Sequence, residues 1–500
     1  MVCSASRSPK RAEQIKLHKI EMRTNIDEEI DNRMKKVFLI SPSLQRDVQA
    51  RNIDNSYGLG LGYLHSVIEL AGYDIKTISY NNVDEYYSIK EVRAHLLEFC
   101  PDYLLLNIFT MNRVASYRII NMVRKLQPEI TIIVGGVHAT VQYKQMLESC
   151  PIDYVVLGEG EITIVELLKA LDKKVNTDDI QGIAYCREGR VIKTEDRELV
   201  KDLDQLPFPK HELFMNPKRT LACILSSRGC PHKCSFCCLD IISKRKFRAR
   251  SVANVVEEVE YILNNFKHIK IVQFADDTFA QSIRRAKEFC YEIIRRGIKV
   301  EFWTSARFKP TDQELFELMG KAGFTNIGFG LETGSEKLLK SIHKNINQDD
   351  VKEVFHQLKN TKLNVGTFLL VGFPGETKET INETIGLLKE LKRIIPTYKM
   401  SAATLLWIYP GTEVYDIAKE KGMLTDDFWL SDGDVPRYTV EHSYYKLYYM
   451  AQKMTNVTSP FRQLAKCLAI FPRDFYRFLV KRYEEVRIKK FLKTICRESE

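Results

Sequence analysis

A cluster of cysteines in the middle of the chain holds the residues best able to do chemistry. It reads Cys230-Pro-His-Lys-Cys234-Ser-Phe-Cys237, a C-x3-C-x2-C spacing. Three thiolates this close can hold three corners of a cubic [4Fe–4S] cluster, which takes four thiolates when fully ligated. The fourth iron would then be open to a ligand from outside the chain.

Zinc is the alternative metal for such a group of thiols. A structural zinc site has four closed ligands, and the nearest further candidate is Cys238, which directly follows Cys237. Two adjacent cysteines bind one zinc ion only with backbone strain, and the sequence offers no second C-x2-C pair. We therefore predict Cys230, Cys234 and Cys237 as iron ligands and expect Cys238 to take no part.

Length and composition set the frame for this cluster. A chain of 500 residues predicts two or three domains, and 44% hydrophobic with 28% charged residues is typical of a globular protein in water. No apolar run reaches the roughly 18 residues of a membrane-spanning helix. Residues 1–36 lack the apolar core of a secretory signal, so we expect a flexible leader.

Cysteine usage and net charge indicate the compartment and the partners. The 12 cysteines are scattered outside the one cluster, which indicates the reducing cytoplasm rather than a disulfide scaffold. The net charge of +10 is modest for this length. We expect it to reflect a solvated surface, with no nucleic-acid partner.

Residues 37–172 alternate between short apolar runs and helical patterns. Apolar runs such as 37–40, 103–108 and 130–134 are each followed by a segment with helical spacing, and the alternation occurs five times. This pattern predicts an α/β domain with a doubly wound, Rossmann-like parallel sheet. Ligands bind such sheets at the carboxyl ends of the strands.

Pairs of glycines fall at those expected strand ends. Glycine lets the backbone approach a large flat ligand closely, although a plain turn also uses glycine. The pairs are Gly58 with Gly60, Gly135 with Gly136, and Gly158 with Gly160.

Residues 173–220 are predicted to form a hairpin and a stiff linker that ends near Leu206-Pro-Phe-Pro209. Residues 221–410 then contain six strand–helix units, which predict a partial parallel (β/α)6 barrel. Chemistry in parallel barrels lies on the loops that follow the strands. The cysteines, Asp276, Asp277, Glu332 and Glu376 all fall on such loops.

Two of these acids have structural alternatives. Asp276-Asp277 could cap the helix expected at 281–296, since aspartate is a frequent N-cap. Glu332 could pair with a surface lysine. Their common position at one rim of the barrel favours a functional site.

The barrel motifs resemble those of the radical S-adenosylmethionine (SAM) enzymes. The cysteine motif, D-D-x-F from Asp276, G-L-E-T-G-S-E around Glu332 and G-F-P-G-E-T from Gly372 carry this resemblance, over about 221–410. It implies that the three cysteines bind a [4Fe–4S] cluster and that SAM chelates the open iron. It further places Phe236 near the adenine and Asp276 or Asp277 near the amino group. Glu332 would be near the methionine or ribose, and Gly372 to Pro374 on the adenine side.

The first domain resembles the cobalamin-binding domain at the amino end of many radical SAM enzymes. The stretches 134–140 (VGGVHAT) and 153–161 (DYVVLGEGE) carry this resemblance, over about 37–172. The resemblance implies that the following residues surround the corrin: Gly58, Gly60, Thr110, Gly135, Gly136, His138, Gly158, Glu159 and Gly160.

One departure concerns the cobalt. The D-x-H-x-x-G motif that supplies an axial histidine is replaced by Ser41-Pro42-Ser43 after the first strand. The resemblance therefore implies cobalamin without that ligand. We expect His65, His95 and His138 to be packing or loop residues.

The two resemblances together imply a cobalamin-dependent radical SAM enzyme. In such an enzyme one electron would enter the cluster and cleave SAM to a 5′-deoxyadenosyl radical, which would remove a hydrogen atom from an unactivated carbon. Methylcobalamin would then supply a methyl group to that carbon, and a second SAM would remethylate the cobalt. The expected partners are a small-molecule or lipid substrate and an electron donor such as flavodoxin or ferredoxin. Oxidative cyclisation or rearrangement without net methyl transfer is the alternative reaction, and a non-catalytic cobalamin or SAM sensor is the alternative class.

Residues 411–500 are predicted to be helical. Aromatic pairs such as Tyr444-Tyr445 suggest a cover over the barrel mouth, with a plain helical cap as the alternative. From Phe471 onward a basic amphipathic pattern suggests either peripheral membrane contact or a solvated helix. The substrate stays open.

Overall fold

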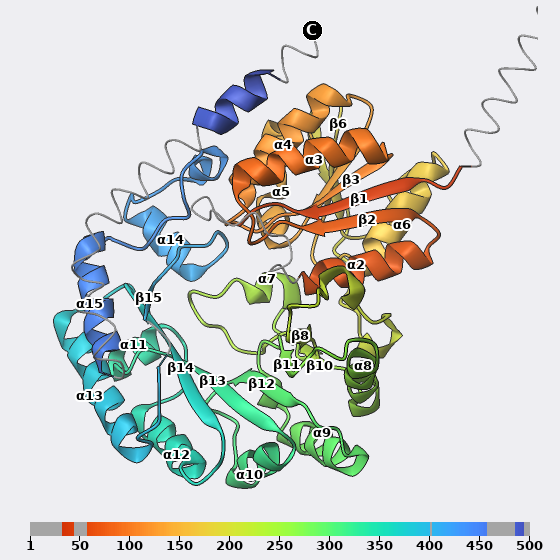
Figure 1. The fold of residues 1–500 in the computed structure, drawn as a ribbon. Coiled ribbons are helices and arrows are strands. Elements are labelled where there is room, and N and C mark those ends of the chain that lie inside the picture. The colour runs from red at the N-terminus through yellow and green to blue at the C-terminus, as the bar shows by residue number, and fades with distance from the viewer. Residues whose placement is uncertain (1–32, 45–57, 401–402, 458–485, 495–500) are drawn as a thin grey trace, which may run out of the picture.

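The computed structural model describes residues 33–44, 58–400, 403–457 and 486–494. Two sheets of mostly parallel strands dominate it, one above the other in Figure 1, with the short helix α7 (Leu239–Ser243) between them. Most of the leader predicted at 1–36 lies outside the described residues.

The first sheet has the predicted doubly wound topology. Its strand order is β2-β1-β3-β4-β5-β6-β7, and all pairings from β2 to β5 are parallel. The parallel strands are β1 (Lys36–Ser41), β2 (Asp74–Ser79), β3 (Tyr103–Asn107), β4 (Thr131–Gly135) and β5 (Tyr154–Val156). The helices are α2 (Leu59–Leu70), α3 (Glu85–Phe99), α4 (Arg113–Leu126), α5 (Val137–Ser149) and α6 (Glu161–Asp172).

Alternate residues of β1 and β3 build two separate cores. Phe38 and Leu104 pack with α3, α4 and α5, whereas Leu39 and Leu105 pack with α2 and α6. Strand order reverses between β1 and β3, and ligands bind such sheets outside the carboxyl ends at this point.

The hairpin at 173–220 belongs to the first sheet. β6 (Ile183–Arg187) pairs antiparallel with β5, and β7 (Arg190–Lys193) pairs antiparallel with β6. Ile183 and Ala184 are fully buried in the two cores. Of the junction predicted at 173–220, only the segment after β7 therefore lies outside the first sheet.

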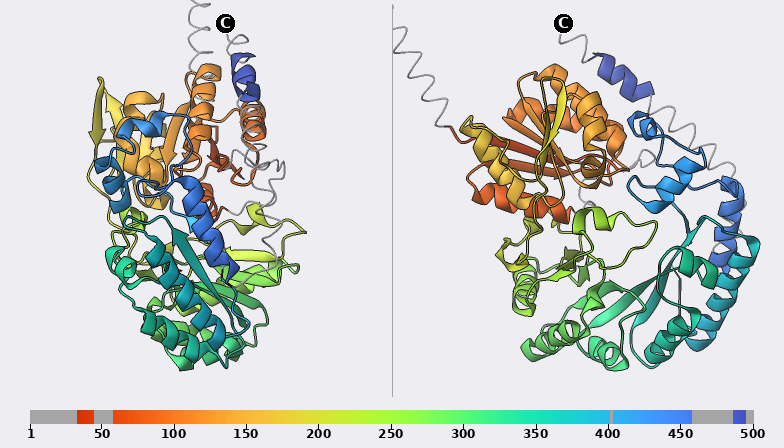
Figure 2. Two further views of the ribbon diagram at one scale, coloured as in Figure 1. Left: turned by 90° about the vertical axis from the view of Figure 1, so that its left-hand side faces the viewer. Right: turned by 180° about the vertical axis from the view of Figure 1, so that it is seen from behind.

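The second sheet is the predicted partial barrel. Its order is β15-β14-β13-β12-β11-β8 with parallel pairing throughout, and β8 and β15 stay at the edges (Figure 2). The strands are β8 (Leu221–Ile224), β11 (Ile271–Phe274), β12 (Glu301–Ala306), β13 (Phe324–Glu332), β14 (Asn364–Val371) and β15 (Thr404–Leu405). The main helices on its outer face are α8 (Val252–Asn265), α9 (Ile283–Arg296), α10 (Gln313–Lys321), α12 (Gln348–Leu358) and α13 (Lys378–Ile394).

A segment beyond the barrel ties the second sheet to the first. It contains α14 (Glu413–Glu420) and the 3-10 turn η5 (Asp426–Leu430). Trp429 is fully buried with residues of the barrel side, and the buried Arg113 of α4 donates to the carbonyls of Trp429, Ser431 and Gly433. The guanidinium thus holds the segment's backbone against α4.

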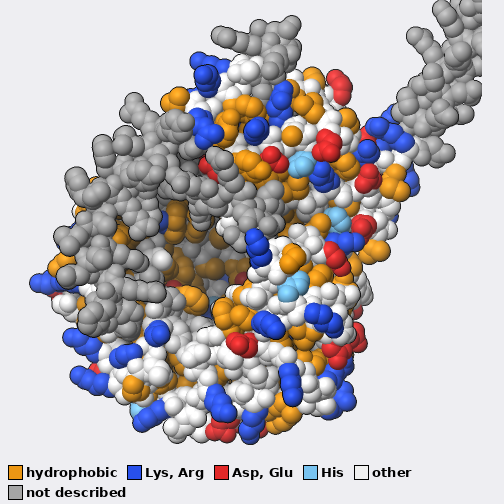
Figure 3. All heavy atoms as spheres, viewed as in Figure 1, with side chains coloured by type: hydrophobic (Ala, Val, Ile, Leu, Met, Phe, Trp, Pro, Cys, Tyr) orange, Lys and Arg blue, Asp and Glu red, His pale blue; other side chains and the backbone are white. Residues whose placement is uncertain are grey.

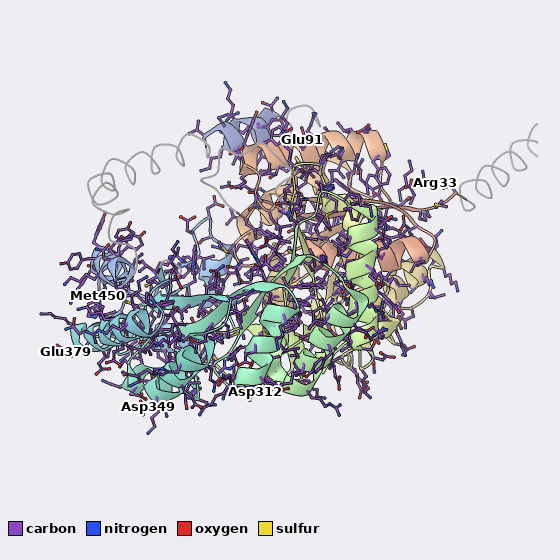
Figure 4. All side chains as sticks on the ribbon, turned by 60° about the horizontal axis from the view of Figure 1, so that its bottom comes forward. Arg33, Glu91, Asp312, Asp349, Glu379 and Met450 are labelled. Atoms are coloured by element: carbon purple, nitrogen blue, oxygen red, sulfur yellow. The ribbon has the colours of Figure 1, made fainter. Side chains whose placement is uncertain are left out.

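The helix that was expected to cover the barrel mouth packs elsewhere. α15 (Tyr444–Asn456) buries Leu447, Met450 and Met454 in the barrel core beside α13, while Tyr445 is exposed. Figure 4 shows the labelled Met450 at that outer edge. The alternative of a plain helical cap therefore describes α15.

The basic tail is described only in part. Residues 471–485 of the predicted amphipathic helix lie outside the described residues, and 486–494 are helical. Ile488 is buried and Phe491 packs in the core beside α3 and α4, while Arg487 lies over the ring of Tyr86. This part of the tail thus turns its apolar side to the protein. Within the described residues, no helix is both long and apolar enough to span a membrane.

Replacing Trp429 by alanine should release the segment that joins the two sheets. Removal of a buried tryptophan costs about 3–5 kcal/mol. We expect faster hydrogen exchange in residues 413–438 and unchanged exchange in β1 and β3. Tyr445→Ala, at an exposed aromatic, is the control and should leave exchange unchanged. Equal exchange in wild type and W429A would contradict this role.

Candidate active site

The cysteine loop is held in place from several sides. The backbone N–H of Ser235 donates to the carbonyl of Ile342 at 3.2 Å, and the N–H of Val414 donates to the carbonyl of Ser235 at 3.1 Å. The position of the cysteine loop is therefore set by the segment that follows β13 and by the start of α14.

Gly229 makes the entry to the loop possible. Its φ is +85°, and a Cβ there would lie 2.2 Å from the carbonyl oxygen of Lys246. Its N–H donates to Asp277 Oδ2 at 2.9 Å. Only glycine fits this close approach, which fixes the backbone directly before Cys230.

The three predicted iron ligands lie within electrostatic range of one another. Burial and, to a smaller extent, the neighbouring thiols of Cys238, Cys234 and Cys230 together raise the pKa of Cys237 to about 12. Arg307 Nη1 donates to Cys234 Sγ at 3.6 Å. Among the residues that the structure describes, no three His, Cys, Asp or Glu side chains are arranged as ligands of one metal ion.

These thiols fit an iron–sulfur cluster. Thiolates bring negative charge, and a neighbouring guanidinium N–H offsets part of it. The fourth cysteine, Cys238, is the N-cap of α7, and its electrostatic influence reaches Tyr409.

The two aspartates brace the loop and do not cap a helix. Asp276 accepts from the Ser226 N–H at 2.7 Å and from the Ser227 hydroxyl at 2.7 Å, and burial raises its pKa. Ser282 is the N-cap of α9, so the capping alternative is wrong.

Glu332 pairs with a lysine, as its alternative proposed, but the lysine is buried. Lys344 Nζ lies 2.8 Å from Glu332 Oε1, and both side chains are largely shielded from solvent. The φ of Glu332 is +64°, a conformation that costs strain in a non-glycine residue. Arg307 also donates to the Lys344 carbonyl at 2.6 Å. This pair therefore lies beside the cysteine loop.

The residues expected on the adenine side come together. The ring of Phe236 lies 5.6 Å from that of Phe373, between centroids. Gly372 has a φ of +100°, and its N–H donates to Glu376 Oε2 at 3.2 Å. Pro374 follows in the same turn. The cysteine loop therefore contacts the loop after β14 through the rings of Phe236 and Phe373.

A cavity of about 340 Å³ lies at the carboxyl edge of the first sheet. From the barrel side its walls include Gly229, Asp277 and Leu239. A Cβ at Gly60 or Gly158 would meet nothing within 4 Å. Glycine thus keeps this cavity wide. The predicted corrin residues that line it are Gly60, Gly135, Gly136, Gly158, Glu159 and Gly160.

His138, Thr110 and Gly58 do not line this cavity. His138 is fully buried, with Thr110 Oγ1 3.2 Å from Nδ1 and the Tyr117 hydroxyl 3.1 Å from Nε2. Burial, with a smaller contribution from the charge of Arg113, lowers its pKa to about 3. His138 therefore supports the glycine loop from behind as a neutral core residue.

His65 and His95 do not line the cavity either. His65 Nδ1 bonds to Thr77 and His95 Nδ1 lies 2.8 Å from Lys76 Nζ. The segment Ser41-Pro42-Ser43 is tied to its own domain, since the Ser41 hydroxyl donates to Asn81 at 2.6 Å. The three histidines are packing residues, as expected.

A buried group of charges joins the cavity to the cysteine loop. Arg228 and Arg248, on the small strands β9 (Ser227–Arg228) and β10 (Arg248–Ala249), donate to Glu159 at 3.2 and 2.8 Å. Arg228 also donates to Glu161 at 2.7 Å and lies over the ring of Tyr63. These five residues all line the cavity. The loop after β5 is therefore ion-paired to the strand that enters the cysteine loop.

The comparisons with known proteins agree with this geometry. The Radical SAM superfamily model matches residues 224–388, and the B12 binding domain model matches residues 55–168. The chain therefore carries a B12-binding domain followed by a radical SAM domain. This enzyme therefore uses a [4Fe–4S] cluster, SAM and cobalamin, with a reductant and a small-molecule substrate.

Individual relatives are similar over much of this radical SAM enzyme. It is 27% identical to an uncharacterized methyltransferase of Pyrococcus horikoshii, over 79% of this chain and 86% of the relative. It is 28% identical to the anaerobic magnesium-protoporphyrin IX monomethyl ester cyclase of Cereibacter sphaeroides, over 65% of this chain and 55% of that protein. The structure of the cobalamin-dependent SAM radical enzyme OxsB with aqua-cobalamin shares its fold, with a TM-score of 0.67 at 17% identity, over 92% of this chain and 81% of OxsB.

Sequence reasoning missed several residues of this site. The missed residues are Arg228, Arg248, Arg307 and Lys344. The last three gave no signal because each gains its role from a contact with another segment of the chain. Arg228 alone had a clue, since it directly precedes Gly229 and the cysteines.

Glu159→Gln should loosen the joint between the two sheets. The pKa of Glu159 is lowered from 4.5: burial opposes this, but the Arg248 hydrogen bond and the Arg228 charge outweigh burial. Loss of one partner from a buried ion pair costs about 3–5 kcal/mol. We expect a lower Tm at pH 7.

The pH dependence gives a second readout. A depressed carboxyl pKa contributes stability above the unfolded pKa, and that stability is lost as pH falls through the folded pKa. The Tm difference between wild type and E159Q should therefore shrink below about pH 4.5, the usual glutamate value. Glu198→Gln, at an exposed pair with Lys201, is the control. A Tm difference that stays constant with pH would count against the ion pairs.

Proposed function

We propose that the chain methylates an unactivated carbon of a small molecule or lipid. The carrying observation is that the glycine-lined cavity of the first sheet shares its wall with Gly229 and Asp277, directly beside the cysteines. When bound, the cluster and SAM supply radical chemistry and cobalamin supplies a methyl carrier. The residues between them set the distance over which these groups meet.

Each part of the site has a role in this proposal. Cys230, Cys234 and Cys237 hold the cluster, and Arg307 donates a hydrogen bond to the sulfur of Cys234. Phe236 and the turn Gly372 to Pro374 receive the adenine, Asp277 the amino group, and Glu332 the methionine or ribose. Asp276 positions the loop through Ser226 and Ser227.

The corrin contacts fall to the backbone of the glycine loops. Gly60, Gly135, Gly136, Gly158 and Gly160 leave room at the cavity wall, and Glu159 is engaged by arginines. Gly58, Thr110 and His138 support these loops from outside the cavity. We propose cobalamin without an axial histidine, which fits the absence of His65, His95 and His138 from the cavity wall.

Methyl transfer is favoured over cyclisation by relative coverage. The methyltransferase of Pyrococcus horikoshii is matched over 86% of its length, and the cyclases over 55 to 74% of their lengths. An apolar substrate is supported by Phe368 of β14. Its neighbours Thr367 and Leu369 are buried, so Phe368 faces the concave side of the barrel, where 44% of it is exposed.

We further propose a flavodoxin or ferredoxin as the electron donor and a cytoplasmic location. The described cysteines are free thiols, which suits a reducing compartment. Within residues 486–494 the apolar side of the basic tail is packed against the protein. Only the rest of the basic tail therefore remains a candidate for membrane contact.

The cluster assignment is tested by iron content. Anaerobic reconstitution should give about four irons per chain, and Cys230→Ala, Cys234→Ala or Cys237→Ala should each lose the brown chromophore. Cys238→Ser should keep it. A full cluster in the three alanine variants would contradict the assignment. With methyl-labelled SAM, label in the product supports methylation, and an unlabelled cyclised product supports the alternative.

Gly60→Trp should block cobalamin without unfolding the chain. Gly60 lies in the first turn of α2, lines the cavity, and has open space where a Cβ would project. We expect cobalamin content, measured by the corrin absorbance, to fall at least tenfold while iron content stays normal. Gly320→Trp, at an open helical position in α10, is the matched control. Normal corrin loading of G60W would place cobalamin elsewhere.

A further inference from the structure

Arg437 lies over an aromatic ring at the end of the barrel sheet. Its guanidinium lies over the ring of Trp407, which follows β15, the last strand of the barrel sheet. The two residues form an antiparallel backbone bridge. Ile408 donates to the Pro436 carbonyl at 2.9 Å, and Tyr438 donates to the Leu406 carbonyl at 3.2 Å. The pair of Arg437 and Trp407 is therefore held in place by backbone hydrogen bonds of the residues on both sides of it.

The guanidinium has no carboxylate or carbonyl partner within the described residues. Its Nη1 is buried and makes no hydrogen bond there. Burial lowers the pKa of Arg437 to about 10, and the more distant Tyr444, Tyr409 and Asp434 offset this only in part. A buried donor without a partner is costly, so the site is built for a group that arrives from outside.

Other arginines near the site have a carboxylate, thiol or carbonyl partner. Arg228 and Arg248 pair with Glu159, and Arg250 pairs with Glu258. Arg307 donates to Cys234 and to the Lys344 carbonyl. All arginines have five N–H donors. Arg437 differs from the others in that no acceptor binds these donors in the part of the chain that the structure describes.

Its position places Arg437 beside the cysteine loop. Both Cys238 and Arg437 influence the pKa of Tyr409 electrostatically, so the three residues lie close together. Neither Arg437 nor Trp407 lines the cavity of the first sheet. Figure 3 shows that the molecule is hollowed between the barrel and the first sheet, with hydrophobic side chains inside. A substrate anchored at this rim would reach the cysteine loop.

We propose that Arg437, stacked on Trp407, binds an oxyanion of the substrate, a carboxylate or a phosphate. The guanidinium presents two parallel N–H donors in a plane, which matches such oxygens better than a lysine does. This inference rests on the proposed function and adds the chemical class of its substrate. The anion is held at one end, and the apolar part extends toward Phe368 and the cysteine loop.

The test uses small aromatic probes on the full chain, reconstituted anaerobically with cluster and cobalamin and with SAM present. Binding of benzoate, phenyl phosphate and neutral benzamide is measured by ligand-observed NMR titration. We expect benzoate or phenyl phosphate to bind at least tenfold more tightly than benzamide. Arg437→Gln should lower that affinity at least tenfold, and Arg437→Lys should lie between.

Arg187→Gln is the matched control, because Arg187 also stacks on an aromatic ring, Tyr185, but is paired with Asp178. It should bind the probes as wild type does. Equal binding by wild type and R437Q overturns the proposal, as does no binding of either anionic probe to wild type.

Two further arms identify which oxyanion occupies the site. If benzoate binds only when SAM is omitted, Arg437 serves the SAM carboxylate, and the substrate assignment is wrong. If it binds only when cobalamin is omitted, the cobalamin phosphate occupies the site, with the same consequence. Iron and corrin contents are measured on every sample, so a wild-type chain that fails to take up cobalamin contradicts the proposed function and not the anion site.

Discussion

The buried ion pairs between Glu159, Glu161, Arg228 and Arg248 are the constraint on which the rest of the structure depends. Two domains that each fold around their own core have no reason to keep a fixed separation unless something specific joins them. Here the joint is made by charges that are largely shielded from water, and loss of one partner leaves the other charge buried and unpaired at high cost. The acids follow β5 and one arginine precedes Gly229. The cavity and the cysteine loop are thereby held in register.

A second joint closes the molecule on the other side. Arg113 binds three carbonyls of the segment around Trp429, and Trp429 packs in a core that also includes Phe373 and approaches Phe236. Because hydrogen bonds from a charged donor are stronger than neutral ones, this contact is more than surface packing. Two joints on opposite sides leave the space between the sheets with a defined width, which suits chemistry that passes between two bound groups.

The site uses backbone geometry as much as side chains. Gly229 permits the loop to pass within contact of Lys246, and the glycines of the first sheet leave their cavity wall bare. The charged side chains near the cysteines, Arg307 and the pair Glu332 with Lys344, are bound to each other's backbone or side chains. They are therefore preorganised, and an incoming cofactor meets fixed dipoles rather than mobile chains. Arg437 is the exception and is open to a partner.

The sequence by itself determined the elements whose signals are local. Strand and helix alternation predicted both sheets, and the cysteine spacing predicted the iron–sulfur cluster, because periodicity and short spacing act within a few residues. SAM and cobalamin were implied by the resemblance of the strand-end motifs to those of radical SAM enzymes. Tertiary structure alone decided which distant residues meet. It placed His138 in the core rather than at the cavity, moved the hairpin into the first sheet, and set α15 at the barrel's outer edge. It also paired Arg228 with Glu159 and left Arg437 unpaired on Trp407. The physical reason is that an ion pair, a stacked ring or a buried orphan donor exists only once two distant segments are packed together, and no spacing within one segment encodes it.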